Sequence, residues 1–274
     1  MKSQRRVIKI PYIKKITKCG DRIFVEKTWS SRYGTKGQIL HVRYSGDPTA
    51  EKQQKVNERN AQKRYAMLIA ANAEPGDYWI TFTYRRGSTL PENHKEQRKQ
   101  FDKYILRPLR KLYKKQGKKL RYILRLVSKE EGCRPHFHLF CKNDGVNLAD
   151  FPVWEFGNPQ IKIFDNRLHQ TLGEYICQFH HKKKAKKKQE EKQEEKDIDL
   201  KISEKGRVSC SKNLIRPHTD YYIIKRPSWR DDPQIPKGYM IDPASIINGD
   251  VENPYTRGMY RYQSYVLVKI RKKE

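Results

Sequence analysis

The chain has 274 residues and carries 60 lysines and arginines against 31 aspartates and glutamates, a formal net charge of +29. A chain with such an excess of positive charge attracts polyanions. Nucleic acid is the first candidate and an anionic membrane surface is the second. No apolar run approaches the roughly 20 residues of a membrane-spanning helix, and the start, MKSQRRVIKI, lacks the pattern of a signal peptide. We therefore expect a cytoplasmic protein with no membrane partner and no small-molecule substrate.

The five cysteines, at positions 19, 133, 141, 177 and 210, contain no C-x-x-C pair and are odd in number. Neither a zinc knuckle nor a disulfide framework is indicated. We interpret them as reduced thiols, most of which pack in the interior.

The first half of the chain alternates predicted strands and helices. Residues 1–48 mix basic with β-branched and aromatic residues, which predicts a strand-rich basic extension. Residues 49–73 have the periodicity of a helix. Apolar residues and threonines alternate over 78–84, as in a central strand. A second helix is predicted over 93–116, with Gly117 at its end.

The second half continues this pattern. Strands are predicted over 120–127, over 134–140, which runs antiparallel to it, and over 160–164. A third helix begins near Asn166 and runs into a Lys/Glu-rich low-complexity tract over 182–203. That tract is interpreted as a solvated helical extension or a disordered segment, or as an arm that binds nucleic acid.

The order of these elements predicts an α+β fold in which helices pack on an antiparallel central sheet, as in ferredoxin-like and RNA-recognition folds. Strand character returns at 208–211, and an alternating strand over 260–270 closes the chain. We expect three segments: a basic extension over 1–48, the main domain over 49–226, and a Tyr/Pro-rich segment over 227–274.

Two histidines stand two residues apart in the stretch RPHFHLF. Alternate residues of a strand point to the same face, so His136 and His138 would project together while Phe137 and Leu139 anchor the other face in a core. Two neutral imidazoles on one face form a bidentate grip for a metal ion. The alternative is two ordinary half-buried histidines, because so short a motif also arises by chance.

A divalent cation held by two imidazoles can polarise a phosphoryl oxygen. Water as the nucleophile would make a simple nuclease, whereas a side-chain hydroxyl would give a covalent protein–DNA intermediate. Tyr175, on the third predicted helix, is the candidate nucleophile. Its spacing from Leu168, Leu172 and Phe179 is also that of a core stripe, so packing is the competing interpretation.

Together these residues resemble a known family. Over roughly residues 55–217 the chain is similar to the HUH endonucleases, specifically to the rolling-circle replication initiators of small bacterial phages and plasmids. The resemblance rests on five motifs in the family's order: 57–66 with 71–72 and 77–84, Pro135-His136-Phe137-His138-Leu139, Trp154-Glu155-Phe156-Gly157, Gly173-Glu174-Tyr175-Ile176-Cys177, and 209–214 with Pro217.

The chain departs from the family pattern near the tyrosine and at the third metal ligand. Family members often carry a lysine three residues after the tyrosine, where this chain has Gln178. Lys182, two helical turns from Tyr175, offers a positive charge on the same face; alternatively, Gln178 is a metal ligand, as in related transposases. The third ligand is often a glutamate before the histidines. Here Ser128 stands near that place, and Glu130 in the following turn is the candidate ligand.

The resemblance implies a metal-dependent endonuclease that nicks single-stranded DNA at an origin, with Mg²⁺ or Mn²⁺ on His136 and His138. Attack by Tyr175 would leave a 5′-phosphotyrosine and a free 3′-OH that primes synthesis, and the reverse attack would rejoin the strand. Phe179 stands where some members have a second tyrosine, so a single-tyrosine mechanism is expected.

The same resemblance implies single-stranded or hairpin origin DNA as the partner. Phosphate contacts are expected from four basic residues: Arg85, Arg86, Arg134 and Lys182. No G-x-x-x-x-G-K-[ST] loop is present, so a host helicase and polymerase would unwind and copy the DNA. The competing interpretations are a basic nucleic-acid-binding protein without catalysis, and an HUH relaxase or transposase.

Overall fold

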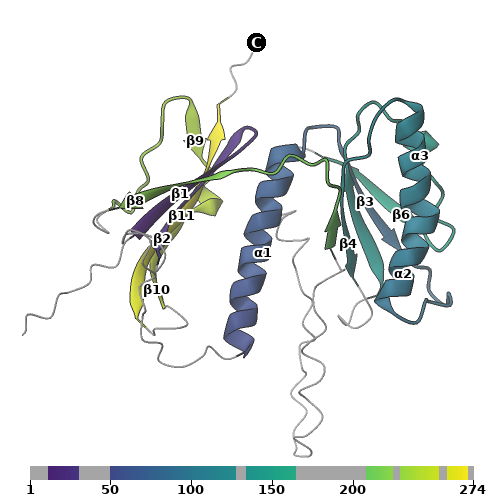
Figure 1. Ribbon diagram of the computed structural model, residues 1–274, viewed down its shortest axis with the longest axis horizontal. Coiled ribbons are helices and arrows are strands. Elements are labelled where there is room, and N and C mark those ends of the chain that lie inside the picture. Colours follow the sequence, from purple (N-terminus) through teal and green to yellow (C-terminus); the bar gives the residue numbers. More distant parts are fainter. Residues whose placement is uncertain are drawn as a thin grey trace, which may run out of the picture. The chain divides into compact units, whose positions relative to one another are not determined.

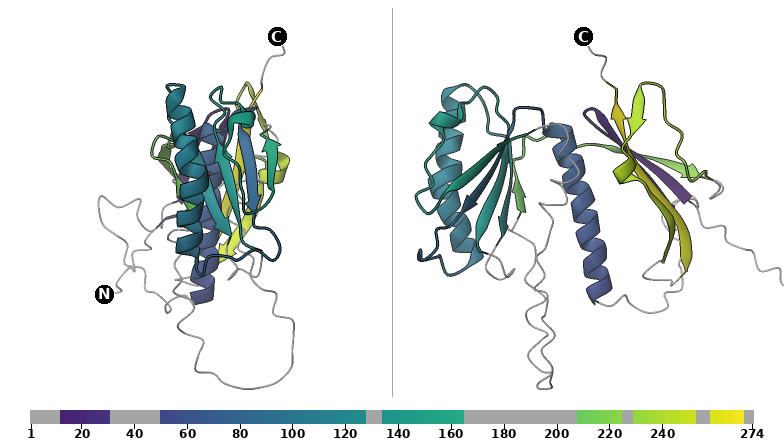
Figure 2. Two further views of the ribbon diagram at one scale, coloured as in Figure 1. Left: turned by 90° about the vertical axis from the view of Figure 1, so that its right-hand side faces the viewer. Right: turned by 180° about the vertical axis from the view of Figure 1, so that it is seen from behind.

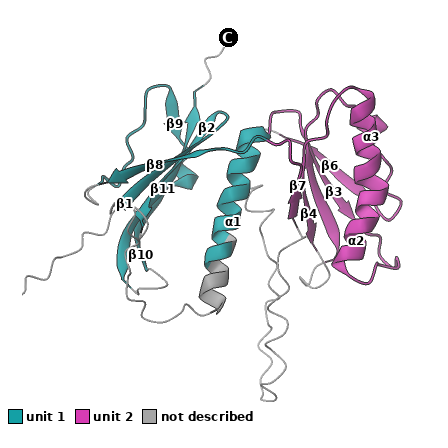
Figure 3. Ribbon diagram, in the orientation of Figure 1, with its two compact units in different colours: residues 1–72, 215–274 teal, residues 73–214 magenta. Residues whose placement is uncertain are grey.

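The computed structural model describes residues 12–30, 50–127, 134–164, 208–224, 229–252 and 258–270. The chain forms two compact units, unit 1 from residues 1–72 and 215–274 and unit 2 from residues 73–214 (Figure 3). The fold is α+β and mostly antiparallel β, as predicted in outline, but the prediction of one central sheet is wrong because each unit has its own. Within the described ranges, no helix is long and apolar enough to cross a membrane.

Unit 1 is a six-stranded antiparallel sheet with one long helix. The strands follow the order β10-β11-β2-β1-β8, and β9 also pairs with β11. The elements are β1 (Tyr12–Cys19), β2 (Arg22–Trp29), α1 (Ala50–Asn72), β8 (Thr219–Ile224), β9 (Tyr239–Ile241), β10 (Ile247–Glu252) and β11 (Met259–Lys269). Strands from the two ends of the chain therefore pair with each other, since β2 is the direct neighbour of β11.

Unit 2 holds the two-histidine strand. Its five-stranded antiparallel sheet has the order β6-β3-β5-β4-β7, and a helical segment lies along one face (Figures 1 and 2). The elements are β3 (Tyr78–Thr83), α2 (His94–Phe101), α3 (Arg107–Lys115), β4 (Tyr122–Val127), β5 (His136–Cys141), β6 (Pro159–Ile163) and β7 (Val208–Cys210).

The helical segment is one continuous rod, as predicted, with a π-helical turn at Asp102–Leu106 between α2 and α3. It begins at Asn93, whose side chain accepts hydrogen bonds from the backbone N–H groups of Lys95 and Glu96. Pro108 lies in the first turn of α3 and has no N–H to donate to the preceding turn. A local widening to π-helical bonding, such as the bond from the Arg107 N–H to the Asp102 carbonyl, is a way to accommodate that loss.

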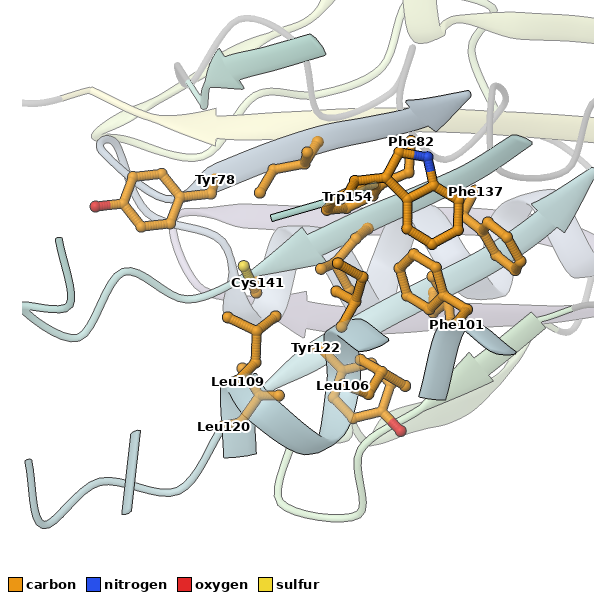
Figure 4. Packing of buried hydrophobic residues seen from close by; sticks show 14 of the residues in the cluster. Tyr78, Phe82, Phe101, Leu106, Leu109, Leu120, Tyr122, Phe137, Cys141 and Trp154 are labelled. Atoms are coloured by element: carbon orange, nitrogen blue, oxygen red, sulfur yellow. The ribbon is translucent and has the colours of Figure 1, made fainter. Parts of the chain in front are cut away.

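The core of unit 2 lies between this rod and the sheet (Figure 4). Phe137 and Leu139 of β5 are fully buried in it, as their alternation with the histidines predicted. The Phe101 ring of α2 stacks on Phe137 with 4.2 Å between the ring centroids, and Trp154 packs edge-on against Phe82. These contacts fix β5 and β3 with their opposite faces directed away from the rod.

Three strands were not predicted: β8, β9 and β10. The third predicted helix, the Lys/Glu-rich tract, Cys133 and Cys177 lie outside the described residues. The other predicted strands and helices correspond to described elements within a few residues at each end.

Candidate active site

The two histidines lie on the sheet face opposite the helical rod. In the register of β3 and β5, His138 is paired with Thr81 and His136 with Thr83. Since Phe137 is buried against the rod, His136 and His138 project to the other side. Their side chains converge: the two Nε2 atoms are 3.0 Å apart.

The other nitrogen of each ring is held by a neighbour. Nδ1 of His136 lies 2.7 Å from the Arg134 carbonyl oxygen. A carbonyl only accepts, so this nitrogen carries the proton and Nε2 keeps its lone pair. Nδ1 of His138 lies 3.1 Å from Oγ1 of Thr81, a hydroxyl that can donate or accept. When the Thr81 hydroxyl donates to Nδ1 of His138, the proton of this ring is on Nε2 and can bridge to Nε2 of His136. When the hydroxyl accepts, Nδ1 carries the proton, and the Nε2 lone pairs of both rings can face a cation.

The donor set fits a divalent cation. Two nitrogens bound at right angles to an ion at about 2.1 Å lie about 3.0 Å apart, which is the separation observed between the Nε2 atoms. Ligating histidines commonly donate the other ring N–H to a carbonyl or hydroxyl neighbour. His136 and His138 are therefore the residues that would hold Mg²⁺ or Mn²⁺.

The remaining members of the predicted site lie outside the described residues. They are Tyr175, Gln178, Lys182 and Glu130. Among the described residues, no group of three His, Cys, Asp or Glu side chains is arranged to hold a metal ion. The described part of the site is thus the histidine pair, and the proposed third ligand comes from a range that the structure leaves undescribed.

Sequence reasoning missed three residues around the pair: Thr81, Trp79 and Arg125. The indole of Trp79 stacks on the His138 ring at 5.7 Å between centroids, and Arg125 of β4 is the register partner of His138 and is almost fully buried. The period-two alternation of β3 already placed Trp79 and Thr81 on one face. Arg125 could be placed beside His138 only from the register of β4 and β5. The apolar sequence around Arg125 does not indicate which residue lies opposite it.

Three predicted DNA-binding arginines lie at the His136 end of the sheet. Arg85 and Arg86 come shortly after the end of β3, and Arg134 lies two residues before the start of β5. All three are exposed. Their positions leave the guanidinium groups available to phosphates near the histidine pair.

The Trp154-Glu155-Phe156-Gly157 turn holds this end of β3. Nε1 of Trp154 donates to the Thr83 carbonyl at 3.2 Å, and the Arg85 N–H donates to the Phe156 carbonyl at 2.6 Å. A Cβ atom on Gly157 would overlap the Thr83 carbonyl oxygen. A glycine is therefore required for the turn to approach β3 this closely.

The described tyrosines of unit 2 and its buried Cys141 are poorly placed to attack a phosphate at the histidine pair. Burial raises the pKa of the Cys141 thiol well above its usual range, as it does for the Tyr84 and Tyr113 hydroxyls. Tyr78 and Tyr122 belong to the core beneath the rod, on the face opposite the histidines. Tyr104 lies on the π-helical turn and packs against Phe156.

Comparison with known proteins finds a family match within unit 2. Residues 77–197 match the family model of the replication-associated protein ORF2 and the phage gene II protein. The match covers less than half of the chain. The matched segment includes β3, the histidine pair of β5 and Tyr175. No curated protein and no solved structure matches the chain.

Proposed function

We propose that this chain is a rolling-circle replication initiator in which unit 2 is an HUH-type endonuclease. The match of residues 77–197 to the family of ORF2 and gene II replication proteins implies initiation of rolling-circle replication. The observation that carries the finer proposal is the pair of Nε2 atoms converging at 3.0 Å, within the matched segment, on the sheet face away from the core. Nδ1 of each imidazole has a hydrogen-bonding neighbour, as is usual for histidines that bind a metal ion. A histidine that only packs in a core does not require this arrangement.

Tyr175 is the nucleophile in this proposal, and the other tyrosines support it by elimination. The matched segment contains six tyrosines. Four belong to the core beneath the rod, and the fifth, Tyr104, lies on the rod itself. Tyr175 is the sixth, and it stands in the motif that resembles the family's nucleophile motif.

The reaction proceeds by transesterification. The Tyr175 oxygen forms a bond to the scissile phosphorus while the bond from phosphorus to the 3′ oxygen breaks. The leaving oxygen takes up a proton as a 3′-OH, and the protein keeps the downstream strand as a 5′-phosphotyrosine. The number of phosphoester bonds is unchanged, so the 3′-OH can reverse the step without ATP.

The described residues orient the phosphate. A divalent cation on His136 and His138 would polarise a non-bridging oxygen of the scissile phosphate. Thr81 and the Arg134 carbonyl fix the two rings, while Arg85, Arg86 and Arg134 hold the flanking phosphates. Outside the described residues, Glu130 or Gln178 would complete the metal site, and Lys182 would add positive charge near Tyr175.

The test uses the purified full chain and single-stranded DNA from the origin of its own genetic element, labelled at either end. We expect an adduct of protein with the downstream fragment on denaturing gels, present with Mn²⁺ and absent with EDTA. Tyr175→Phe and His136→Ala should abolish it. Tyr104→Phe and His218→Ala are matched controls that should retain it, because Tyr104 is on the rod and His218 is an exposed residue of unit 1.

Two results would contradict the proposal. Cleavage without any adduct would make water the nucleophile and Tyr175 a packing residue. Binding without cleavage of any origin sequence would favour a basic nucleic-acid-binding protein that has no catalytic activity.

A further inference from the structure

The sheet of unit 1 has two different faces. Helix α1 packs on one of them, where the ammonium group of Lys63 lies 2.7 Å from Glu26 of β2. Glu26 is also the partner of Lys15 at 3.0 Å. Since neighbouring strand residues alternate, Lys14 and Lys27 belong to the opposite face.

That opposite face carries a cluster of aromatic and basic side chains, the Trp229 patch. We define it by six residues: Tyr12, Lys14, Lys27, Tyr222, Trp229 and Arg261. The register pairs Lys14 with Lys27 on one side and with Tyr222 on the other. The patch thus crosses neighbouring strands and does not follow a single loop.

Trp229 is the centre of the patch. The ammonium of Lys27 lies 5.5 Å from its ring centroid and the guanidinium of Arg261 lies 5.4 Å from it. The Tyr12 ring packs edge-on against it at 5.6 Å. The indole N–H of Trp229 is buried and has no acceptor among the described residues, so Trp229 contributes to the patch through its ring.

The positive charges of the patch are only partly compensated. Arg261 is paired with Asp231 at 2.6 Å, whereas Lys27 donates to the neutral side chain of Gln263 at 2.7 Å. Neither Lys14 nor Lys27 forms an ion pair with a carboxylate of the described chain. Burial and then the charges of Lys14 and Arg261 lower the pKa of Lys27. Like charges placed directly across two strands cost stability, a cost that a bound polyanion would offset.

One ring of the patch is available for stacking. Tyr222 is 53 % exposed and lies opposite Lys14 in the register of β1 and β8. Aromatic rings next to cations on an open sheet are the elements that bind single-stranded nucleic acid, because unpaired bases stack on the rings while lysines contact phosphates. A duplex offers no unpaired base to such a surface.

We propose that the Trp229 patch is a second DNA-binding surface, which holds single-stranded DNA outside the nicking site through stacking on Tyr222 and phosphate contacts from Lys14 and Lys27. The choice of DNA rests on the proposed function. The binding itself does not depend on nicking, because the patch belongs to unit 1 and the histidine pair to unit 2.

The test measures binding of the full chain to a fluorescent oligothymidylate by fluorescence anisotropy. The buffer contains EDTA, so that nicking does not contribute to the signal. Tyr222→Ala should weaken binding about 5- to 160-fold, the range for loss of one stacked base. Tyr221→Ala is the matched control: Tyr221 is 49 % exposed on the same strand but points to the other face. Tyr222→Phe keeps the ring and should restore most of the affinity.

The lysines have a separate readout. Replacement of both Lys14 and Lys27 by glutamine should reduce the slope of log affinity against log salt by about 1.4, because each lost phosphate contact to a single strand removes about 0.7. Lys237→Gln removes an exposed charge from the same unit outside the patch and should leave the slope unchanged.

Three results would overturn the proposal. They are unchanged binding in Tyr222→Ala, equal loss in Tyr221→Ala, or equal affinity of the wild-type chain for a duplex of the same length. Adduct formation with origin DNA in Mn²⁺, measured in parallel, reports on the nicking proposal alone, so that failure of one proposal is not mistaken for failure of the other.

Discussion

Replacement of Thr81 by valine tests the histidine pair as a metal site without removing a ligand. Valine has nearly the shape of threonine, so β3 should keep its packing, but Nδ1 of His138 loses the hydroxyl 3.1 Å away. Loss of such an outer hydrogen bond typically weakens metal binding by about 10- to 100-fold, which is roughly 1.4 to 2.7 kcal/mol. We expect the dissociation constant for Mn²⁺ to rise by that factor.

The assay is isothermal titration calorimetry of the full chain with Mn²⁺, and Thr83→Val is its control. Thr83 is on the same strand and the same face, paired in register with His136, yet its hydroxyl is not hydrogen-bonded to either imidazole of the described pair. Unchanged Mn²⁺ affinity in Thr81→Val, or an equal loss in both variants, would refute the assignment of Thr81 as the residue that orients His138.

Two further substitutions test the fold around the site and the ion pairs of unit 1. Gly157→Ala should cost about 1 to 3 kcal/mol in urea denaturation, the typical range for overpacking, because the new Cβ would meet backbone atoms of β3; Glu155→Ala in the same turn should be close to neutral. Glu26 is half-buried, which raises the pKa of its carboxyl, but Lys63 and Lys15 outweigh this effect and hold that pKa below its usual 4.5. A lowered folded-state pKa stabilises the protein above the unfolded-state pKa, and that stability is lost as pH falls through the folded-state value. Glu26→Gln should therefore flatten the fall of the urea midpoint between about pH 5 and pH 3, whereas a fall as steep as in wild type would show that this ion pair is not responsible.

The local part of the site followed from the sequence. Period-two alternation in RPHFHLF placed Phe137 and Leu139 in the core and both histidines on the other face, and the structure confirms this arrangement. Strand alternation is a property of the backbone alone, so it can be predicted without knowledge of any neighbouring strand.

The neighbours of the histidines depended on register. Thr81 and Arg125 approach His138 only because β3 and β4 flank β5 with particular residues opposite each other. A shift of one residue would turn every side chain of a strand to the other face. The sequence pattern of one strand does not show which residues of the neighbouring strands lie opposite it. From the sequence alone, a buried arginine in an apolar run also cannot be distinguished from a solvated one.

The sheet of unit 1 was the largest omission. It joins β2 to β11 across more than two hundred residues, and β8 and β10 are largely exposed strands that lack a clean alternation of apolar and polar residues. Pairing of segments so distant in sequence leaves no local periodicity. For this reason the Trp229 patch, which draws residues from both ends of the chain, became visible only in the structure.

Peptide mapping of the adduct tests whether Tyr175 forms the covalent bond to DNA. After nuclease trimming and trypsin digestion, the tyrosine lies in a peptide of residues 168–182, between Arg167 and Lys182. If Tyr175 is the nucleophile, this peptide carries a 5′-linked nucleotide on Tyr175 when Mn²⁺ is present. A nucleotide attached to any other residue, or cleavage products that all end in free 5′-phosphates, would contradict it.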